Sequence, residues 1–295
     1  MLSVLAFLIW GLKLGIDFKG GSLLFGEFGV SAPANKDIQD ALAKSDVGET
    51  LVQKTGERGV ILRFKEVDEP KHQEILKALE DLAAKQDKNT FAQKSFESVG
   101  PSIGKELRSK SITAVALVLL LVISYIAFAF RGVSYPLASW KYGIATLAAL
   151  FHDIIIPIGL FAVLGHFYNI EISSGFIAAI LTVLGYSVHD SIIVFDRIRE
   201  NLIKHHGKTF DETVNISVNQ TFVRSINTSL TVILVLLSIY FLGGESIKYI
   251  ALALMVGVGV GTYSSIFIGS TILTSWYALR VRDQNRIELR SSKMR

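Results

Sequence analysis

Asp190 is the residue of this chain whose type and position point most directly to chemistry. It is the only Asp, Glu, Lys or Arg in a long apolar stretch, Ile172–Phe195. An acid inside a bilayer is costly, so it normally faces the interior of a helix bundle and has a partner there. Ser187 and Tyr186 lie one helical turn earlier and can flank it on the same helix face. The sequence therefore predicts a buried polar site around Asp190.

Arg224 is the predicted partner of Asp190. It lies at the start of the next long apolar stretch, on the same side of the membrane, and shares a helix face with Thr228 and Thr231. Desolvation would favour the protonated acid, whereas a nearby guanidinium would favour the ionised acid. The pair is therefore either a proton switch, in which Arg224 moves toward and away from Asp190, or a static ion pair that holds two helices together.

Asp153 is a second acid in an apolar stretch, with His152 directly before it. Two interpretations stay open: it belongs to the same proton pathway, or it hydrogen-bonds a neighbouring helix. His189 adjoins Asp190 but is rotated by about 100° around a helix. We expect His189 to be a packing residue rather than a ligand.

Five long apolar stretches must position these residues. Hydrophobic residues make up 50% of the 295-residue chain and charged residues only 19%, against about 25% charged in an average soluble domain. Each stretch reaches the ~20 residues that a membrane-spanning helix needs. They are Ser111–Phe130, Tyr142–Gly165, Ile172–Phe195, Ser225–Gly244 and Tyr249–Leu279. The sequence thus predicts an all-α membrane bundle. Gly257, Gly259 and Gly261 predict a surface where two helices approach closely, either for static packing or for sliding during a conformational change.

The residues Met1–Leu12 are apolar but too few to span a bilayer. We interpret them as part of a first span whose beginning is missing, which gives six spans in all. A short helix at the membrane interface is the alternative.

Basic residues predict the orientation of the spans. The gaps Arg131–Lys141 and Asp196–Arg224 carry two and five Lys or Arg, and the segment after Leu279 carries six. The alternate gaps, His166–Glu171 and Glu245–Lys248, carry one Lys or Arg between them, Lys248. Because positive loops stay in the cytoplasm, both termini are expected there. The same rule explains the basic tail without a nucleic-acid partner.

Residues 17–105 are expected to form an external domain, in the periplasm of a cell with two membranes. Asn35 is expected to cap a helix that runs to Ser45, and Pro70 suits the first turn of a second helix. The second helix is expected to bury Ile75, Leu76, Leu79 and Leu82. The predicted strands are Ser22–Phe28, Glu49–Lys54, Val60–Phe64 and Thr90–Ser98. The order β-α-β-β-α-β predicts a ferredoxin-like α+β domain.

The predicted division of the chain has four parts. They are a first span at 1–16, the external domain at 17–105, a five-helix domain at 106–279 and a basic tail at 280–295.

Motifs of ordinary enzymes are absent from the sequence. It contains no cysteine, no phosphate-binding loop, no HExxH and no GxSxG. The sequence predicts a membrane protein that is not an enzyme and that needs no metal or organic cofactor.

Several blocks resemble the SecF family of bacterial protein-export subunits, in the expected order along nearly the whole chain. The blocks are Gly15-Ile-Asp-Phe-Lys-Gly-Gly21, Ser98-Val-Gly-Pro-Ser-Ile-Gly-Lys-Glu-Leu107, Gly185-Tyr-Ser-Val-His-Asp-Ser-Ile-Ile-Val-Phe-Asp-Arg-Ile-Arg-Glu-Asn201, Asn219-Gln-Thr-Phe-Val-Arg224 and Gly261-Thr-Tyr-Ser-Ser-Ile266. Two positions depart from the family pattern: His189 stands where Asn is usual, and Ser22 where Thr is usual.

The resemblance implies a partner and an energy source. SecF pairs with SecD in a pseudo-symmetric unit similar to resistance-nodulation-division transporters, in the bacterial inner membrane. The complex uses the proton gradient to draw preproteins from the SecYEG channel after SecA has driven insertion, and YajC is a further expected partner. By resemblance, Asp190, Arg224 and Asp153 are the proton-relay residues.

Three functions follow from these observations. The leading one is a proton-driven accessory subunit of protein secretion, whose external domain contacts the emerging preprotein. A structural subunit that stabilises an assembly is the first alternative. A proton-coupled exporter of small molecules is the second, which the small external domain disfavours.

Overall fold

The computed structural model describes residues 1–86, 89–130, 136–204, 206–207 and 209–293, and the chain divides into two compact units. Unit 1 comprises Met1–Lys13 and Thr113–Arg295, and unit 2 comprises Leu14–Ile112. The long predicted spans therefore fall in unit 1, and the predicted external domain falls in unit 2.

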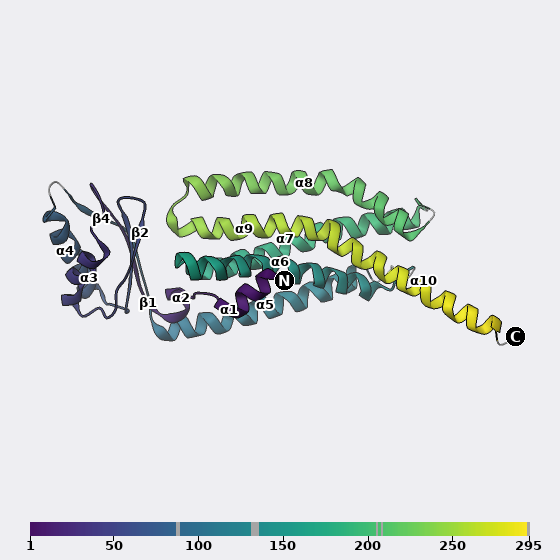
Figure 1. Ribbon diagram of the computed structural model, residues 1–295, viewed down its shortest axis with the longest axis horizontal. Helices are drawn as coiled ribbons and strands as arrows, with labels where there is room; N and C mark the ends of the chain where they lie inside the picture. Colours follow the sequence, from purple (N-terminus) through teal and green to yellow (C-terminus); the bar gives the residue numbers. More distant parts are fainter. Residues whose placement is uncertain (87–88, 131–135, 205, 208, 294–295) are drawn as a thin grey trace. The chain divides into compact units, whose positions relative to one another are not determined.

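Unit 2 is a four-stranded antiparallel sheet with two helices on one face (Figure 1). Its elements are α2 (Ile16–Lys19), β1 (Gly21–Phe28), α3 (Asn35–Leu42), a 3-10 turn (Ala43–Ser45), β2 (Leu51–Thr55), β3 (Gly59–Phe64), α4 (Glu69–Ala84) and β4 (Phe91–Val99). The strand order across the sheet is β2-β3-β1-β4. The predicted sequence of strands and helices is confirmed, because alternating apolar residues on the strands meet apolar stripes on the helices.

The core of unit 2 lies between the sheet and α3 and α4. Alternate residues of β1, Leu24 and Phe28, are buried and meet Ile75 and Leu79 of α4. The predicted Leu76 and Leu82 are only partly buried. His72 and Ala83 are buried at the same spacing as Ile75 and Leu79, so the buried stripe of α4 is rotated from the predicted one.

The predicted cap at Asn35 is wrong. The N-cap of α3 is Ala34, which has an extended backbone and no capping side chain. The Asn35 side chain instead donates to the backbone carbonyl of Val52 at 3.3 Å. A tertiary hydrogen bond has replaced the local one that the sequence favoured.

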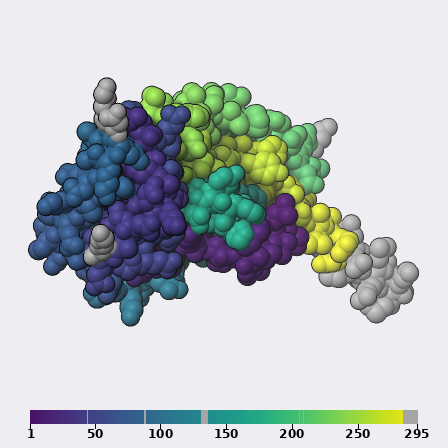
Figure 2. Space-filling view, turned by 60° about the vertical axis from the view of Figure 1, so that its left-hand side comes forward, coloured from purple at the N-terminus to yellow at the C-terminus, as the bar shows by residue number. Residues whose placement is uncertain are grey.

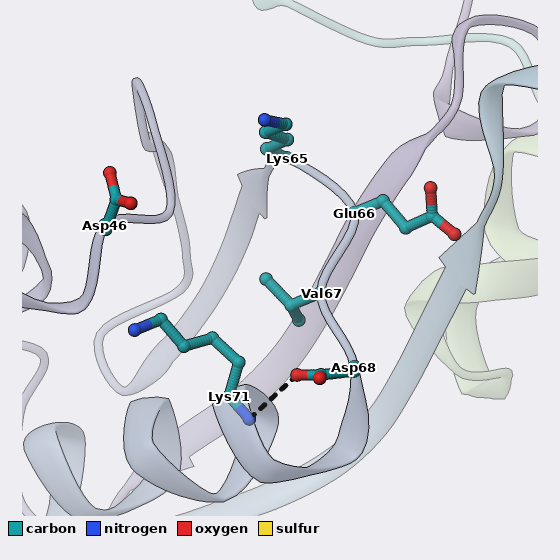
Figure 3. Close-up of a pocket in the computed structure, with 6 residues that line it drawn as sticks. All are labelled: Asp46, Lys65, Glu66, Val67, Asp68 and Lys71. Carbon is teal, nitrogen blue, oxygen red and sulfur yellow. Dashed lines mark hydrogen bonds between the residues drawn. The ribbon is translucent and has the colours of Figure 1, made fainter.

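Helix α4 begins with a capping side chain and a proline in its first turn. Asp68 is the N-cap, and its Oδ1 accepts a hydrogen bond from the backbone nitrogen of Lys71 at 3.2 Å. Pro70 follows at the position where a missing N–H costs nothing. Figure 3 shows this contact together with Asp46, Lys65, Glu66 and Val67. These residues line an open hollow with a volume of about 440 Å³.

We expect Asp68→Ala to loosen the first turn of α4. Loss of an N-cap side chain costs about 1 kcal/mol, so amide hydrogens at the start of α4 should exchange roughly fivefold faster. Hydrogen exchange of the full chain, read by mass spectrometry, measures this directly. Asp81→Ala is the matched control, because Asp81 is an exposed residue further along α4. Equal exchange in the two variants would contradict the capping role.

Unit 1 is a helix bundle. Its elements are α1 (Leu2–Trp10), α5 (Pro101–Ala129, which begins in unit 2), α6 (Ser139–Tyr168), α7 (Ser174–Ile203), α8 (Phe210–Leu242), α9 (Glu245–Tyr263), a π-helical segment (Ser264–Gly269) and α10 (Ser270–Lys293). Within the described residues, five helices are long and apolar enough to cross a membrane; the last of them is the continuous run Glu245–Asp283. The five predicted stretches are therefore confirmed as candidate spans. Helix α1 has nine residues and is not among them.

Helix α1 packs against α6 although it is short. The backbone of Ser3 approaches Gly159 so closely that a Cβ at Gly159 would lie 2.4 Å from the Ser3 Cα. At the other end of α1, Trp10 stacks on His166 with ring centroids 5.0 Å apart. Figure 2 shows this purple helix beside teal surface. Small and aromatic residues thus fix the N-terminal helix to the bundle.

Glycines of α9 allow its close approach to α7 and α8. A Cβ at Gly257 would lie 2.3 Å from Cγ2 of Val183 on α7, and one at Gly261 would lie 3.2 Å from Cβ of Ser187. Gly259 faces α8, where Ile233 is the nearest side chain at 3.9 Å. The predicted close-approach surface therefore exists, and its tight side faces the helix that carries Asp190.

Candidate functional site

Helix α7 presents one buried polar face. Ser187, Asp190 and Ser191 lie three and four residues apart, and all three are almost fully buried. Asp190 is 1% exposed although it lies in a candidate membrane span. This is the placement that the cost of a lipid-facing carboxylate requires.

Asp153 of α6 lies in a cage of hydrogen-bond donors. Its Oδ2 accepts from the hydroxyls of Ser187 on α7, at 2.5 Å, and Ser264 in the π-helical segment, at 2.6 Å. Its Oδ1 lies 3.0 Å from Nδ1 of the neighbouring His152, whose side chain is 31% exposed. Asp153 itself is fully buried. Of the two interpretations left open by the sequence, the hydrogen bond to a neighbouring helix is the one observed.

The π-helical segment, Ser264–Gly269, supplies hydroxyl groups to this site. Ser264 donates to Asp153, and Ser265 donates to the backbone carbonyl of Ser187 at 3.2 Å and lies 3.0 Å from the hydroxyl of Ser191. Both serines are 0% exposed although they are consecutive in the chain. A π-helical turn widens the helix locally and is frequent at functional sites.

Asp190 lies in a second, looser network. Its Oδ2 is 3.3 Å from the hydroxyl of Thr262 on α9, which also lies 3.0 Å from the backbone carbonyl of Val258 and contacts the hydroxyl of Ser229 on α8. Tyr186 extends the network, because its hydroxyl lies 3.4 Å from that of Ser229. The single hydroxyl hydrogen of Thr262 can serve only one of these acceptors at a time.

The structure does not bring Arg224 to Asp190. Arg224 is exposed, and within the described residues it forms no ion pair with Asp190. The buried face of α8 is formed by Thr221, Ser225 and Ser229, four residues apart. Arg224 precedes Ser225 by one residue and is therefore turned by about 100° from this buried face. The predicted contact between Asp190 and Arg224 is not formed in this chain.

His189 is also outside the site. It is exposed, whereas its neighbours Val188 and Asp190 are buried. The rotation expected from its sequence position is therefore observed.

The hydroxyl groups that surround the two acids were not predicted from the sequence. These are Ser191, Ser229, Thr262, Ser264 and Ser265. The run Gly261-Thr-Tyr-Ser-Ser265 inside an apolar stretch was the available signal. Hydroxyl residues are common in membrane helices, where they also bond their own backbone, so the run alone did not point to Asp153.

The fold and the site define a class: a multi-span membrane protein with two buried carboxylates, each held at a junction of helices. Residues 78–279 match the model of the family described as protein export membrane protein SecD/SecF, C-terminal. The chain is 45% identical over 280 residues to the protein translocase subunit SecF of Thermobaculum terrenum, covering 91% of this chain and 86% of the relative. It is 37% identical over 270 residues to that of Anaerolinea thermophila, covering 91% and 85%.

Solved structures agree with these relatives. The chain is similar to the crystal structure of SecDF, a translocon-associated membrane protein of Thermus thermophilus, with a TM-score of 0.75 and 35% identity. The match covers 93% of this chain but only 36% of that one. The chain belongs to the SecD/SecF family and, within it, to the SecF subunits of the protein translocase.

Proposed function

We propose that this SecF chain uses the proton gradient to promote release of preproteins from the SecYEG channel on the outer side of the membrane. The carrying observation is Asp190, a carboxylate that is 1% exposed inside a candidate span. Among the described residues, one shared hydroxyl, that of Thr262, donates a hydrogen bond to it. Acids in such positions are a usual part of proton relays. Protonation and release at Asp190 would alternate the charge at the junction of α7, α8 and α9.

The proposal includes an orientation. By the positive-inside rule, the basic gaps and the basic tail support an orientation with both termini in the cytoplasm and unit 2 outside. Helix α1 would then be part of a sixth span. The order of the elements and the sheet order β2-β3-β1-β4 support a ferredoxin-like fold for unit 2. Unit 2 would contact the preprotein, and SecA and YajC would be further partners.

SecD is the proposed membrane partner, and helix α8 offers a face for it. One side of α8 is buried in this chain through Thr221, Ser225 and Ser229. Another side exposes apolar residues suited to lipid, such as Leu230 at 51%. Between the two runs an exposed polar stripe, which we call the α8 polar stripe: Arg224, Asn227, Thr228 and Thr231.

Arg224 and Asn227 make the α8 polar stripe unsuited to lipid. The hydroxyls of Thr228 and Thr231 bond carbonyls of their own helix, so they are satisfied without a partner. An arginine in a membrane helix normally faces a bundle interior or an aqueous cavity and has a partner. In the SecDF structures this part of the fold belongs to a longer chain, of which the present chain matches 36% and 37%. We therefore propose that SecD covers the stripe. In the assembled complex, the positive charge of Arg224 would then influence the ionisation of Asp190, although the two side chains are not in contact in this chain.

We expect a photo-crosslinker attached at Thr228→Cys to capture SecD. The chain contains no native cysteine, so a single introduced thiol defines the attachment point. The matched control is Leu230→Cys, two residues away on the apolar side of α8, which should give little SecD adduct. Equal adducts from the two positions, or a stronger one from Leu230→Cys, would contradict the proposed interface.

The experiment for the whole function is gradient-dependent export. A bacterial strain that lacks its own SecF and carries this chain with the SecD of the same organism should export a reporter preprotein faster when the membrane is energised. An uncoupler should remove the gain while SecA-driven insertion continues. Export that is equally fast with and without the gradient would refute proton coupling and leave a structural subunit as the function.

A further inference from the structure

The two buried carboxylates of unit 1 differ in how well their hydrogen-bonding capacity is met. The hydroxyls of Ser187 and Ser264 lie 2.5 and 2.6 Å from Oδ2 of Asp153. Two close hydroxyl donors stabilise an ionised acceptor more than one distant donor does. The hydroxyl of Thr262 lies 3.3 Å from Asp190, beyond the roughly 2.5–3.0 Å of an ordinary O–H···O bond.

The hydroxyl groups that donate to Asp153 also have fewer competing acceptors than the hydroxyl group that donates to Asp190. Ser187 has no second acceptor among its described contacts, and Ser264 has only the carbonyl of Gly261 at 3.1 Å, further away than Asp153. The hydroxyl of Thr262 is shared between Asp190, Val258 and Ser229. A buried anion is stable only when donors or opposite charges compensate its desolvation. Two close hydroxyl donors offset part of that cost for Asp153, whereas within the described residues Asp190 has one more distant, shared donor.

The groups that face the two acids support the same distinction. His152 from its own helix, Ser187 from α7 and Ser264 from the π-helical segment face Asp153. Nδ1 of His152 lies 3.0 Å from Oδ1 of Asp153, which adds a third polar contact to this carboxylate. Thr262 from α9 faces Asp190, and two residues of its own helix, Tyr186 and His189, lie close enough to interact with its charge. No Lys or Arg of the described residues pairs with it.

We propose that Asp153 is a positioning residue that stays ionised throughout the transport cycle, and that only Asp190 exchanges a proton. The inference rests on the proposed function and assigns its two acids different roles. As a fixed anion, Asp153 ties α6, α7 and the π-helical segment together through two hydroxyls. Thr262 lies two residues before Ser264, so this tie holds the Thr262 hydroxyl beside Asp190.

Gly261 is part of the same arrangement. A Cβ at this position would lie 3.2 Å from Cβ of Ser187 and 3.6 Å from Oδ2 of Asp153. A Cβ at this position would therefore press on the Ser187 side chain beside its bond to Asp153. The backbone, the hydroxyls and the carboxylate form one rigid junction next to the proton-exchanging residue.

Infrared difference spectroscopy distinguishes the two acids, because only a protonated carboxyl group has an acid carbonyl stretch. The full chain is assembled with SecD in membranes and titrated from neutral to acidic pH. The acid band of the membrane interior should disappear in Asp190→Asn and persist in Asp153→Asn. Loss of the band in Asp153→Asn, with persistence in Asp190→Asn, would overturn the inference.

A second pair of variants keeps both carboxylates. Ser264→Ala removes a donor from Asp153, so a second acid band should appear on acidification. Ser265→Ala is the matched control, since Ser265 is its neighbour, is equally buried and has no bond to Asp153; one band should remain. A single unchanged band in Ser264→Ala would contradict the fixed charge of Asp153, even if Asp153→Asn fails to fold.

Export measurements separate this inference from the proposed function. Asp153→Asn should slow gradient-dependent export without moving the pH at which export is half-maximal, because the proton-exchanging group is unchanged. A shifted pH midpoint would assign proton exchange to Asp153 and leave proton-driven export intact. Gradient-dependent export that survives in Asp190→Asn would instead refute the proposed function, whatever the infrared bands show for Asp153.

Discussion

Asp190→Asn should abolish the gain in preprotein export that the proton gradient provides, while the protein still assembles with SecD. The amide has nearly the shape of the carboxyl group and can accept the hydrogen bond of Thr262. It cannot take up and release a proton. Packing at the junction of α7 and α9 should therefore survive, and coupling should not.

The measurement compares export rates with and without an uncoupler in a strain that lacks its own SecF, with SecD co-purification as the test of assembly. Asp196→Asn is the matched control: Asp196 lies on the same helix, but its side chain is 62% exposed and is 3.6 Å from Arg199. That variant should keep the gradient-dependent gain. Loss of assembly in Asp190→Asn would favour a structural role for the acid, and normal coupling in that variant would end the proton-switch hypothesis.

Gly257→Ala should destabilise the bundle, although alanine is the better helix former. A Cβ at Gly257 would lie 2.3, 2.8 and 3.1 Å from three atoms of the Val183 side chain. Val183 is fully buried, and a β-branched side chain on a helix has essentially one allowed rotamer. The overlap must therefore push α9 and α7 apart. Overpacking of this kind costs about 1–3 kcal/mol, which exceeds the gain in helix propensity.

Thermal unfolding of the purified full chain in detergent measures the effect. Gly259→Ala is the control, because a Cβ there would meet only the end of Ile233 at 3.9 Å; its midpoint should stay the same or rise slightly. Combining Gly257→Ala with Val183→Ala should cost less than the sum of the two single changes, since the smaller side chain removes the overlap. Additive losses would show that Val183 is not the obstacle.

The sequence was most informative where one physical rule dominates. Long apolar stretches predicted the five candidate spans, because a membrane helix must be apolar over its length. Alternating apolar residues predicted the order of strands and helices in unit 2. The cost of a carboxylate in lipid predicted that Asp190 is buried. Each of these follows from the solvation of single residues and requires no knowledge of their neighbours.

Contacts between different helices and strands could not be predicted from the sequence and became evident only in the tertiary structure. Spacing allowed Arg224 to meet Asp190, but the small hydroxyl residues of α8 pack inward and turn Arg224 outward. Asn35 was predicted to cap a helix, but its side chain instead forms a hydrogen bond with Val52 of strand β2. In both cases a residue had two physically acceptable partners, and the packing of whole elements chose between them.

The two acids separate what could be read from the sequence from what depends on tertiary packing. The sequence established that Asp153 and Asp190 lie in apolar helices and must be satisfied there. It did not determine that Asp153 has three close polar partners and Asp190 one distant, shared donor. That difference arises because a π-helical turn brings Ser264 to Asp153, and because glycines let α9 approach α7. Solvation decides which residues are buried, whereas close packing decides which donors reach them.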